Sequence, residues 1–217
     1  MLIDSIVARM GTGVPGPVLG FVADGTEHAA RPVVGTEAVS HRRIAIVGSF
    51  STGKTMLAEA LARQLELPLL PETAREVVSL GFKLDKDATP ETETLIFLKQ
   101  YNNEISTPEF VGDRSLVDAL AYAEWVLAHK PHRKEMALWD ECRRLAERRL
   151  RSNYSHVFYL PIEFPIVLDG LRPDDPDFQQ DIDQRILGLL ATNDVAYETL
   201  TGDVPTRTKA LMERVSD

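Results

Sequence analysis

An eight-residue segment in the first third of the chain has the composition of a phosphate-binding loop. It reads G-x-x-x-x-G-K-T, and its members are Gly48, Ser49, Phe50, Ser51, Thr52, Gly53, Lys54 and Thr55. The two glycines allow the backbone to curl, so that successive N–H groups face inward and form an anion-binding nest. Lys54 can reach the β- and γ-phosphates of a nucleotide, and the Thr55 hydroxyl can ligate Mg²⁺. The segment therefore predicts a site for ATP or GTP with Mg²⁺, and ATP is the commoner choice.

Two later sites carry charged residues directly after a short apolar segment. The first has an acid, and the second has an acid followed by an arginine. Glu72 follows residues 68–71, and Asp113 and Arg114 follow residues 110–112. Glu72 could accept the proton of an acceptor hydroxyl, and Asp113 could hold Mg²⁺ directly or through water. Arg114 could neutralise charge on a transferring phosphoryl group or orient the acceptor. The alternative for both acids is helix capping alone, because acids favour helix N-termini.

Arg172 is a candidate on a different kind of segment. It ends the run Asp169-Gly170-Leu171-Arg172, inside a stretch from Pro161 to Asp177 that is rich in proline and aspartate. Such a composition is typical of a loop or lid. An arginine there could close over the phosphates, or it could be an ordinary surface arginine.

These residues need a frame of alternating strands and helices. The apolar run that ends at Val47 indicates a central parallel strand from Arg42, and Leu57, Leu61 and Leu65 give the next helix one apolar face. Further strands are expected over residues 68–71, 110–112, 156–160 and 195–200, and further helices from about residues 73, 90, 115, 132, 178 and 205. This alternation predicts an α/β protein with a five-stranded parallel sheet flanked by helices. Ligands bind outside the carboxyl ends of such strands. The phosphate loop, Glu72 and the Asp113-Arg114 pair are therefore expected to meet at one edge of the sheet.

Capping signals mark the expected helix starts. Thr73 and Glu76 have capping-box spacing, and Ser115 with Asp118 indicates another cap. Pro90 is expected at the first position of its helix.

Composition limits the class of protein. The 217 residues suit one domain, over residues 42–217, with an N-terminal extension of unknown role over residues 1–41. That extension could lie on the surface, cover the active site or form an oligomer contact. Cys142 is the single cysteine, which excludes an internal disulfide and a cysteine zinc cluster. No apolar run approaches 18 residues and no secretory signal is evident, so we expect a cytoplasmic protein without a membrane partner.

Several of these segments resemble a known family. The phosphate loop followed by Leu-Ala-Glu-Ala-Leu-Ala, together with Pro71-Glu72-Thr73-Ala74-Arg75-Glu76, resembles the NadR-type AAA domain, which is ribosylnicotinamide kinase-like. Asp113-Arg114-Ser115 is similar to an acid-arginine element of deoxynucleoside and thymidylate kinases, and residues 169–172 are similar to their lid. The resemblance covers about residues 42 to 215. It implies a three-layer P-loop kinase fold, with Glu72 as base, Asp113 as metal-side acid and Arg114 as substrate-orienting arginine.

The expected function is that of a kinase that moves the γ-phosphoryl group of ATP to a hydroxyl of a nucleoside, a nucleotide or a similar metabolite. A modified base in DNA is a further acceptor of this kind. The alternative is a P-loop ATPase or regulatory NTP-binding module without a small-molecule acceptor. A general nucleic-acid binder is disfavoured by the net charge of −9. No Asn-Lys-x-Asp segment follows a later strand, which disfavours a GTPase, and homo-oligomerisation stays open.

Overall fold

Five parallel strands form one sheet, in the order β2-β3-β1-β4-β5. The computed structural model describes residues 41–130, 133–168 and 173–215. The strands are β1 (Arg43–Val47), β2 (Leu69–Leu70), β3 (Phe110–Asp113), β4 (His156–Tyr159) and β5 (Glu198–Thr199). β1 pairs with β3 on one side and β4 on the other, so it is internal, as its apolar residues predict. The five-stranded parallel sheet is confirmed.

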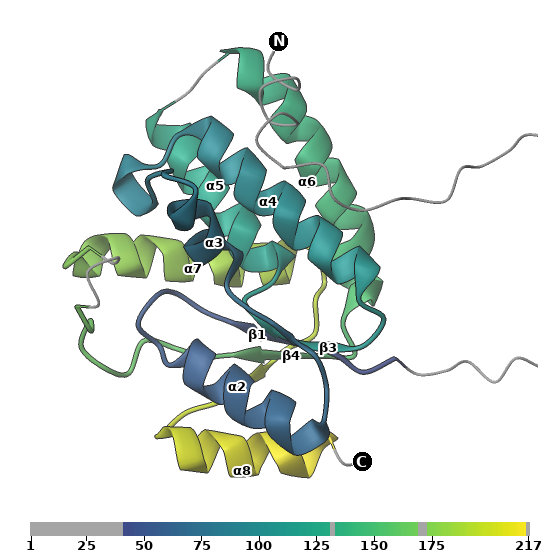
Figure 1. The fold of residues 1–217 in the computed structure, drawn as a ribbon. Coiled ribbons are helices and arrows are strands. Elements are labelled where there is room, and N and C mark those ends of the chain that lie inside the picture. Colours follow the sequence, from purple (N-terminus) through teal and green to yellow (C-terminus); the bar gives the residue numbers. More distant parts are fainter. Residues whose placement is uncertain (1–40, 131–132, 169–172, 216–217) are drawn as a thin grey trace, which may run out of the picture. The chain divides into compact units, whose positions relative to one another are not determined.

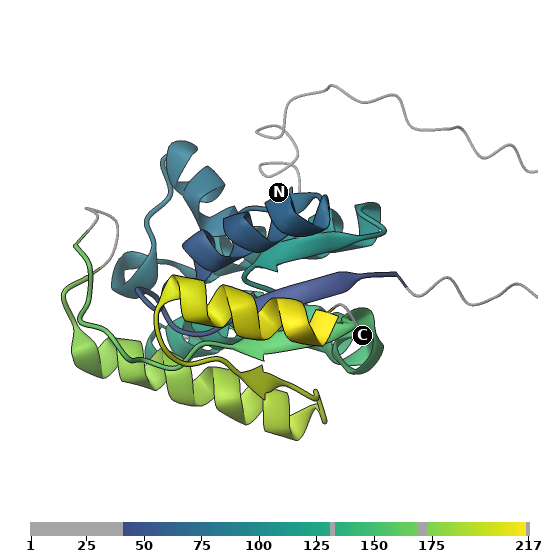
Figure 2. The same ribbon diagram turned by 90° about the horizontal axis from the view of Figure 1, so that it is seen from below.

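Helices cover both faces of this sheet. Within the described residues they are α2 (Lys54–Leu65), α3 (Thr73–Ser79), η1 (Asp85–Asp87, a 3₁₀ turn), α4 (Pro90–Ser106), α5 (Leu116–His129), α6 (Arg133–Asn153), α7 (Pro176–Thr192) and α8 (Val204–Val215). Figure 1 shows α2 and α8 on one face and α5 and α7 on the other, with α4 and α6 packed beyond α5. Figure 2, which is seen from below, shows α8 in front of the sheet, with α2 beside it. This is the three-layer P-loop kinase fold.

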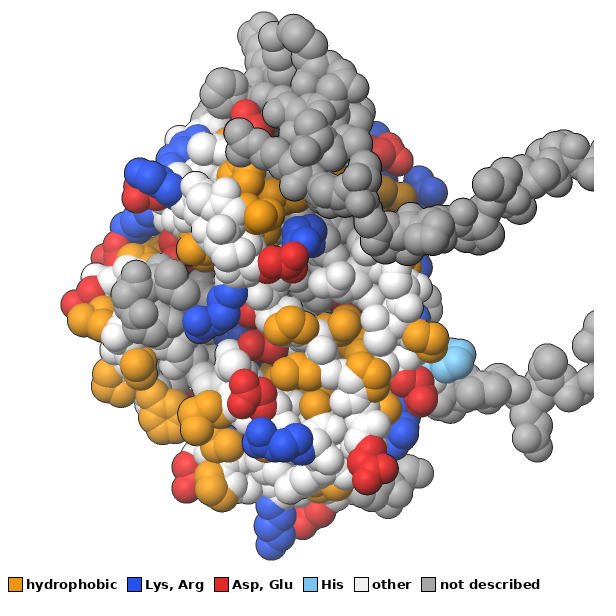
Figure 3. Space-filling model, in the orientation of Figure 1, with side chains coloured by type: hydrophobic (Ala, Val, Ile, Leu, Met, Phe, Trp, Pro, Cys, Tyr) orange, Lys and Arg blue, Asp and Glu red, His pale blue; other side chains and the backbone are white. Residues whose placement is uncertain are grey.

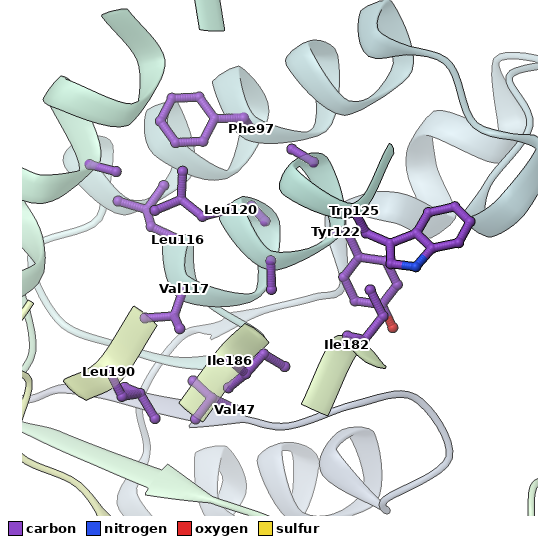
Figure 4. Close-up of a cluster of buried hydrophobic side chains, with 14 of the residues drawn as sticks. Val47, Phe97, Leu116, Val117, Leu120, Tyr122, Trp125, Ile182, Ile186 and Leu190 are labelled. Carbon is purple, nitrogen blue, oxygen red and sulfur yellow. The ribbon is translucent and has the colours of Figure 1, made fainter. Parts of the chain in front are cut away.

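Alternate residues of β1 contribute to two separate hydrophobic clusters. Ile44 and Ile46 pack in the cluster formed with α2 and α8, and Ala45 and Val47 pack in the cluster formed with α5 and α7. The second cluster, drawn in Figure 4, includes Val47, Val117, Leu120, Ile186 and Leu190. Each fully buried aliphatic side chain stabilises the fold by about 1.5–3 kcal/mol. The period-2 alternation of the strand therefore fixes β1 between the two helical layers.

The predicted start of α5 is confirmed in detail. The Ser115 hydroxyl accepts a hydrogen bond from the Val117 N–H at 3.1 Å, and the Asp118 carboxylate accepts one from the Ser115 N–H at 2.9 Å. This is a complete capping box. Pro90 also takes the predicted first position of α4.

Other boundaries differ from the sequence expectation. The capping box at Thr73 and Glu76 is wrong, because the N-cap of α3 is Glu72 and its side chain makes no capping hydrogen bond. The Thr73 hydroxyl instead donates to Gln100 Oε1 at 2.8 Å, a contact with α4 that local spacing does not reveal. The strands β2 and β5 have two residues each, shorter than expected, since an edge strand pairs on one side only.

Two expectations concern parts of the chain that the structure does not describe. Residues 1–40, which make up nearly all of the expected extension, lie outside the described residues, and so does Arg172. The boundary near residue 41 and the lid role of Arg172 therefore stay predictions. Among the described helices, none has both the length and the apolar composition needed to cross a membrane.

Candidate active site

The phosphate loop connects β1 to α2, and its two glycines have backbone conformations that other residues rarely adopt. Gly48 has φ +146° and Gly53 has φ +88°. A Cβ atom on Gly48 would lie 2.5 Å from the carbonyl oxygen of Leu160, which leaves no room for a side chain. Gly53 is the N-cap of α2, so the loop ends where the N–H groups of that helix point outward. Such a helix start attracts anions.

The middle of the loop is attached to α7. The Ser49 hydroxyl donates to the Gln179 carbonyl at 2.8 Å, and the Gln179 side-chain amide donates to the Phe50 carbonyl at 2.7 Å. The Phe50 ring is buried and lies 5.6 Å from the ring of Phe178. Phe50 therefore anchors the loop in the core, and only its backbone is available to a ligand. Ser51 lies at the exposed side, where its hydroxyl accepts from the Val167 N–H at 3.3 Å.

Lys54 is folded back over the loop from which it comes. Its ammonium group donates to the Ser49 carbonyl, and it donates to the Thr52 hydroxyl at 3.2 Å. Burial, with a smaller contribution from the nearby Arg114 guanidinium, lowers the pKa of Lys54 to about 7. An anion bound in the loop would favour the charged form again. The side chain is thus suited to bind nucleotide phosphates as a cation.

Thr55, in the first turn of α2, and Asp113, at the end of β3, bring two oxygen atoms together. The Thr55 hydroxyl donates to Asp113 Oδ2 at 2.7 Å. Burial raises the pKa of Asp113, and the Lys54 ammonium and the Thr55 hydrogen bond oppose that rise. Mg²⁺ prefers oxygen ligands and is usually held by one or two protein groups together with phosphates, so this pair fits the ion. Within the described residues, no group of three or more His, Cys, Asp or Glu could hold a metal.

Glu72 and Arg114 form a buried ion pair beside this loop. Arg114 Nε donates to Glu72 Oε1 at 2.8 Å, and Glu72 Oε2 accepts from Arg75 Nε at 3.1 Å. Glu72 is only 5% exposed. Since its carboxylate makes no capping hydrogen bond, helix capping does not account for this side chain.

The backbone of Arg114 is strained. Its φ is +82°, a conformation that costs a non-glycine residue about 1–3 kcal/mol. The Arg114 N–H donates to the Ile46 carbonyl at 3.1 Å, and the guanidinium lies 5.0 Å from the centre of the Tyr122 ring. Such strain often occurs at functional sites. Here it turns the side chain of Arg114 toward Glu72.

Asp118 links the phosphate loop to Arg114, although the sequence indicated only a helix cap at this position. Its Oδ1 atom accepts from the Gly48 N–H at 3.2 Å and lies 3.8 Å from Arg114 Nη1. Its Oδ2 atom accepts from Ser115. The sequence signal that could have revealed this role is an acid among the apolar residues at the start of α5.

Arg207 supports the phosphate loop from the helical layer formed by α2 and α8. No sequence pattern had indicated this residue. It is buried on α8, and its Nη1 atom donates to the Thr52 carbonyl at 2.6 Å. Its Nη2 atom pairs with Glu163 at 2.5 Å, and its guanidinium lies 5.4 Å from the centre of the Phe164 ring. Arg207 thus connects the phosphate loop to the segment after β4.

A pocket opens directly beside the Glu72–Arg114 pair. Its empty volume is about 410 Å³ with the open mouth included. Side chains from α4 and α5 line it, among them Glu93, Gln100 and Tyr122. The structure therefore brings the phosphate loop, Asp113, Arg114 and Glu72 together, with a partly open pocket next to them.

The fold and this site define a P-loop nucleotide-binding protein of the kinase type. A family model described as an AAA domain matches residues 43–207. The chain therefore belongs to this AAA domain family, and the resemblance to the NadR-type AAA domain is confirmed. No curated protein sequence matches the chain.

Solved structures of kinases share this fold. The NadR protein in complex with NR is 20% identical with a TM-score of 0.66, over 81% of this chain and 50% of that one. The NadR protein in complex with NAD and AMP-PNP is 17% identical with a TM-score of 0.64, over 81% and 48%. This chain thus spans about half the length of either NadR chain.

Two further structures are matched over nearly their full length. Deoxyadenosine kinase from M. mycoides, with products dCMP and dCDP, is 13% identical with a TM-score of 0.59, over 80% of this chain and 98% of that one. Thymidylate kinase from Ehrlichia chaffeensis is 14% identical with a TM-score of 0.56, over 81% and 98%. At these identities the comparisons show the fold alone.

Proposed function

We propose that this protein is an ATP- and Mg²⁺-dependent kinase that phosphorylates a hydroxyl group of a nucleoside, a nucleotide or a similar small metabolite. The observation that carries the proposal is the partly open pocket whose wall holds Glu72 and Arg114, next to the phosphate loop. An NTPase that transfers phosphate only to water has no need of such a pocket. The neighbouring structures contain nucleosides, nucleotides and an ATP analogue, which supports the same class of reaction. Because ATP inside the cell is the donor, a cytoplasmic location is part of the proposal.

Each group of residues in the site has a different role in phosphoryl transfer. The loop N–H groups and Lys54 bind the nucleotide phosphates. Thr55 and Asp113 would hold Mg²⁺, which supplies neutralisation of the phosphate charge. Glu72 would accept the proton of the acceptor hydroxyl, the role of a general base. Arg114 holds Glu72 in place and would neutralise negative charge that develops on the transferring phosphoryl group.

One observation favours the alternative, a P-loop ATPase or regulatory module without a small-molecule acceptor. Hydrophobic side chains of Ile162, Phe164, Val167 and Leu168 are exposed on the segment after β4, where a partner protein could bind. Hydrophobic groups gather at the lower left of Figure 3, where this segment runs. On the same face, Lys and Arg side chains lie among Asp and Glu, which gives no extended basic patch for nucleic acid.

ADP release in the presence of candidate acceptors separates the two functions. Nucleosides, mononucleotides and DNA are tested one at a time with ATP and Mg²⁺. The kinase predicts ADP release that depends on an acceptor and yields a phosphorylated product. ADP release at the same rate without any acceptor would instead support the ATPase.

Two substitutions test the proposed roles of the acids. Glu72→Gln keeps the shape but removes the base, so phosphoryl transfer should fall by about 10²-fold or more while ATP still binds. Asp113→Asn should weaken the response to Mg²⁺, and excess Mg²⁺ should restore part of the rate. The control is Glu76→Gln, since Glu76 is exposed and pairs with Lys99 away from the pocket. Rescue of Glu72→Gln but not of Asp113→Asn by Mg²⁺ would reverse the assignment.

A further inference from the structure

A buried carboxylate lies behind one wall of the pocket. Glu104, near the end of α4, is fully buried and lies where α4 packs against α6 (Figure 1). It accepts side-chain hydrogen bonds from Gln100 Nε2 at 2.8 Å, from Asn153 Nδ2 at 2.6 Å and from the Tyr154 hydroxyl at 2.8 Å. Burial raises the pKa of Glu104 to about 6, and these hydrogen bonds oppose the rise. The carboxyl group is therefore mostly ionised above pH 7.

Gln100 connects this carboxylate to the pocket. It lies one helical turn before Glu104, is itself buried, and lines the pocket together with Thr73. Its Oε1 atom accepts from the Thr73 hydroxyl at 2.8 Å, whereas its Nε2 atom points to Glu104. Thr73 directly follows Glu72, the proposed base. The carbonyl end of the Gln100 amide thus lies on the side of the pocket.

The partners of each amide determine which of its ends is the NH₂ group. An ionised carboxylate only accepts hydrogen bonds, so Glu104 requires the NH₂ group of Gln100 on its side. Asn153 also turns its NH₂ group to Glu104, and its Oδ1 atom accepts from Arg149 Nη2 at 2.8 Å. A guanidinium only donates, so Asn153 cannot turn round without losing this hydrogen bond. The charge of Glu104 therefore decides which end of Gln100 faces the pocket.

We propose that Glu104 is a positioning residue, which holds the Gln100 amide with its carbonyl oxygen toward the pocket and so sets the polarity of this wall. The consequence for substrates rests on the proposed kinase function. A group of the phosphoryl acceptor that donates a hydrogen bond is favoured against this wall, and a group that only accepts is disfavoured. Glu104 acts through Gln100 and not by contact with the phosphoryl acceptor.

Glu104→Gln tests the proposal, because it keeps the shape and replaces one carboxylate oxygen by an NH₂ group. On the side of Asn153, that group would face another NH₂ group, which Arg149 holds there. It therefore takes the side of Gln100, whose amide must turn and present its own NH₂ group to Thr73 and the pocket. The KM for the phosphoryl acceptor should rise about tenfold at pH 8, with kcat and the KM for ATP unchanged.

A second substitution should restore the orientation. In the double variant Glu104→Gln, Asn153→Asp, the new carboxylate at position 153 accepts both from Arg149 and from the new amide at position 104. That amide then turns its carbonyl oxygen toward Gln100, and the KM for the phosphoryl acceptor should return to within about twofold of the wild-type value. The control Asp140→Asn removes an exposed acid of α6 and should change none of these constants. Circular dichroism checks that each variant is folded.

NMR follows the amide without any substrate. The NOE between the Gln100 NH₂ protons and the Thr73 side chain should be stronger in Glu104→Gln than in the wild type, and weak again in the double variant. An unchanged NOE in folded Glu104→Gln would overturn the positioning role. A turned amide with an unchanged acceptor KM would overturn the consequence for substrates. ADP release that no acceptor stimulates would contradict the kinase alone, and the NOE would still decide the orientation.

Discussion

Replacement of Glu93 by glutamine is expected to stabilise the folded protein near pH 8. Glutamine has nearly the same shape as glutamate but carries no charge to be buried. In most core positions a substitution of a buried polar residue destabilises the fold. An increase in stability would therefore show that the fold itself does not require the Glu93 carboxyl group.

The expected change in the free energy of unfolding follows from the pKa of Glu93. Burial, and then the charge of Asp85, raise the pKa of Glu93 from 4.5 to about 8. Between these two values the folded protein binds a proton that the unfolded chain has lost, so the free energy of unfolding falls as pH rises. The slope is up to about 1.4 kcal/mol per pH unit, which gives a loss of roughly 3 kcal/mol between pH 5 and pH 8. The Glu93→Gln variant should not lose this free energy of unfolding, because glutamine does not titrate.

Urea unfolding at pH 5, 6, 7 and 8 measures the prediction. The free energy of unfolding of Glu93→Gln minus that of the wild type should grow with pH by roughly 3 kcal/mol across this range. The matched variant for comparison is Glu91→Gln, on the same helix as Glu93 but outside the pocket wall. A difference that stays constant with pH would refute the reasoning, and so would a Glu93→Gln variant less stable than the wild type at pH 8.

Other residues give further predictions. Lys54→Ala should abolish turnover in a folded protein, as shown by circular dichroism and ATP turnover, and near-normal turnover would contradict the phosphate-loop assignment. Arg207→Ala removes the 2.6 Å hydrogen bond to the Thr52 carbonyl, so the KM for ATP should rise about tenfold relative to the exposed control Lys209→Ala. Glu104→Ala should lower the free energy of unfolding in urea by about 2–4 kcal/mol, because the buried Glu104 carboxylate accepts from Asn153 and Tyr154. An unchanged urea midpoint would show that water replaces the lost carboxylate.

The sequence by itself determined the elements and the phosphate loop of this protein. The apolar run of β1, the glycines at 48 and 53 and the lysine at 54 each depend on neighbours within a strand or a turn. Local spacing also gave the capping box at Ser115 and placed Glu72 and Asp113 at strand ends. It failed at Thr73, where a contact with Gln100 on α4 decides the side chain's partner.

Only the tertiary structure decided which of these residues meet. Arg114 reaches Glu72 across 42 positions of sequence, because β2 and β3 are neighbours in the sheet. Arg207 reaches Thr52 across 155 positions, because α8 packs against α2. Glu93 looks like an ordinary polar residue in the first turn of a helix, and only the packing of α4 against α5 buries it beside an open pocket. Burial and charge balance depend on every element around a side chain, whereas a sequence pattern reports only the neighbours along the chain.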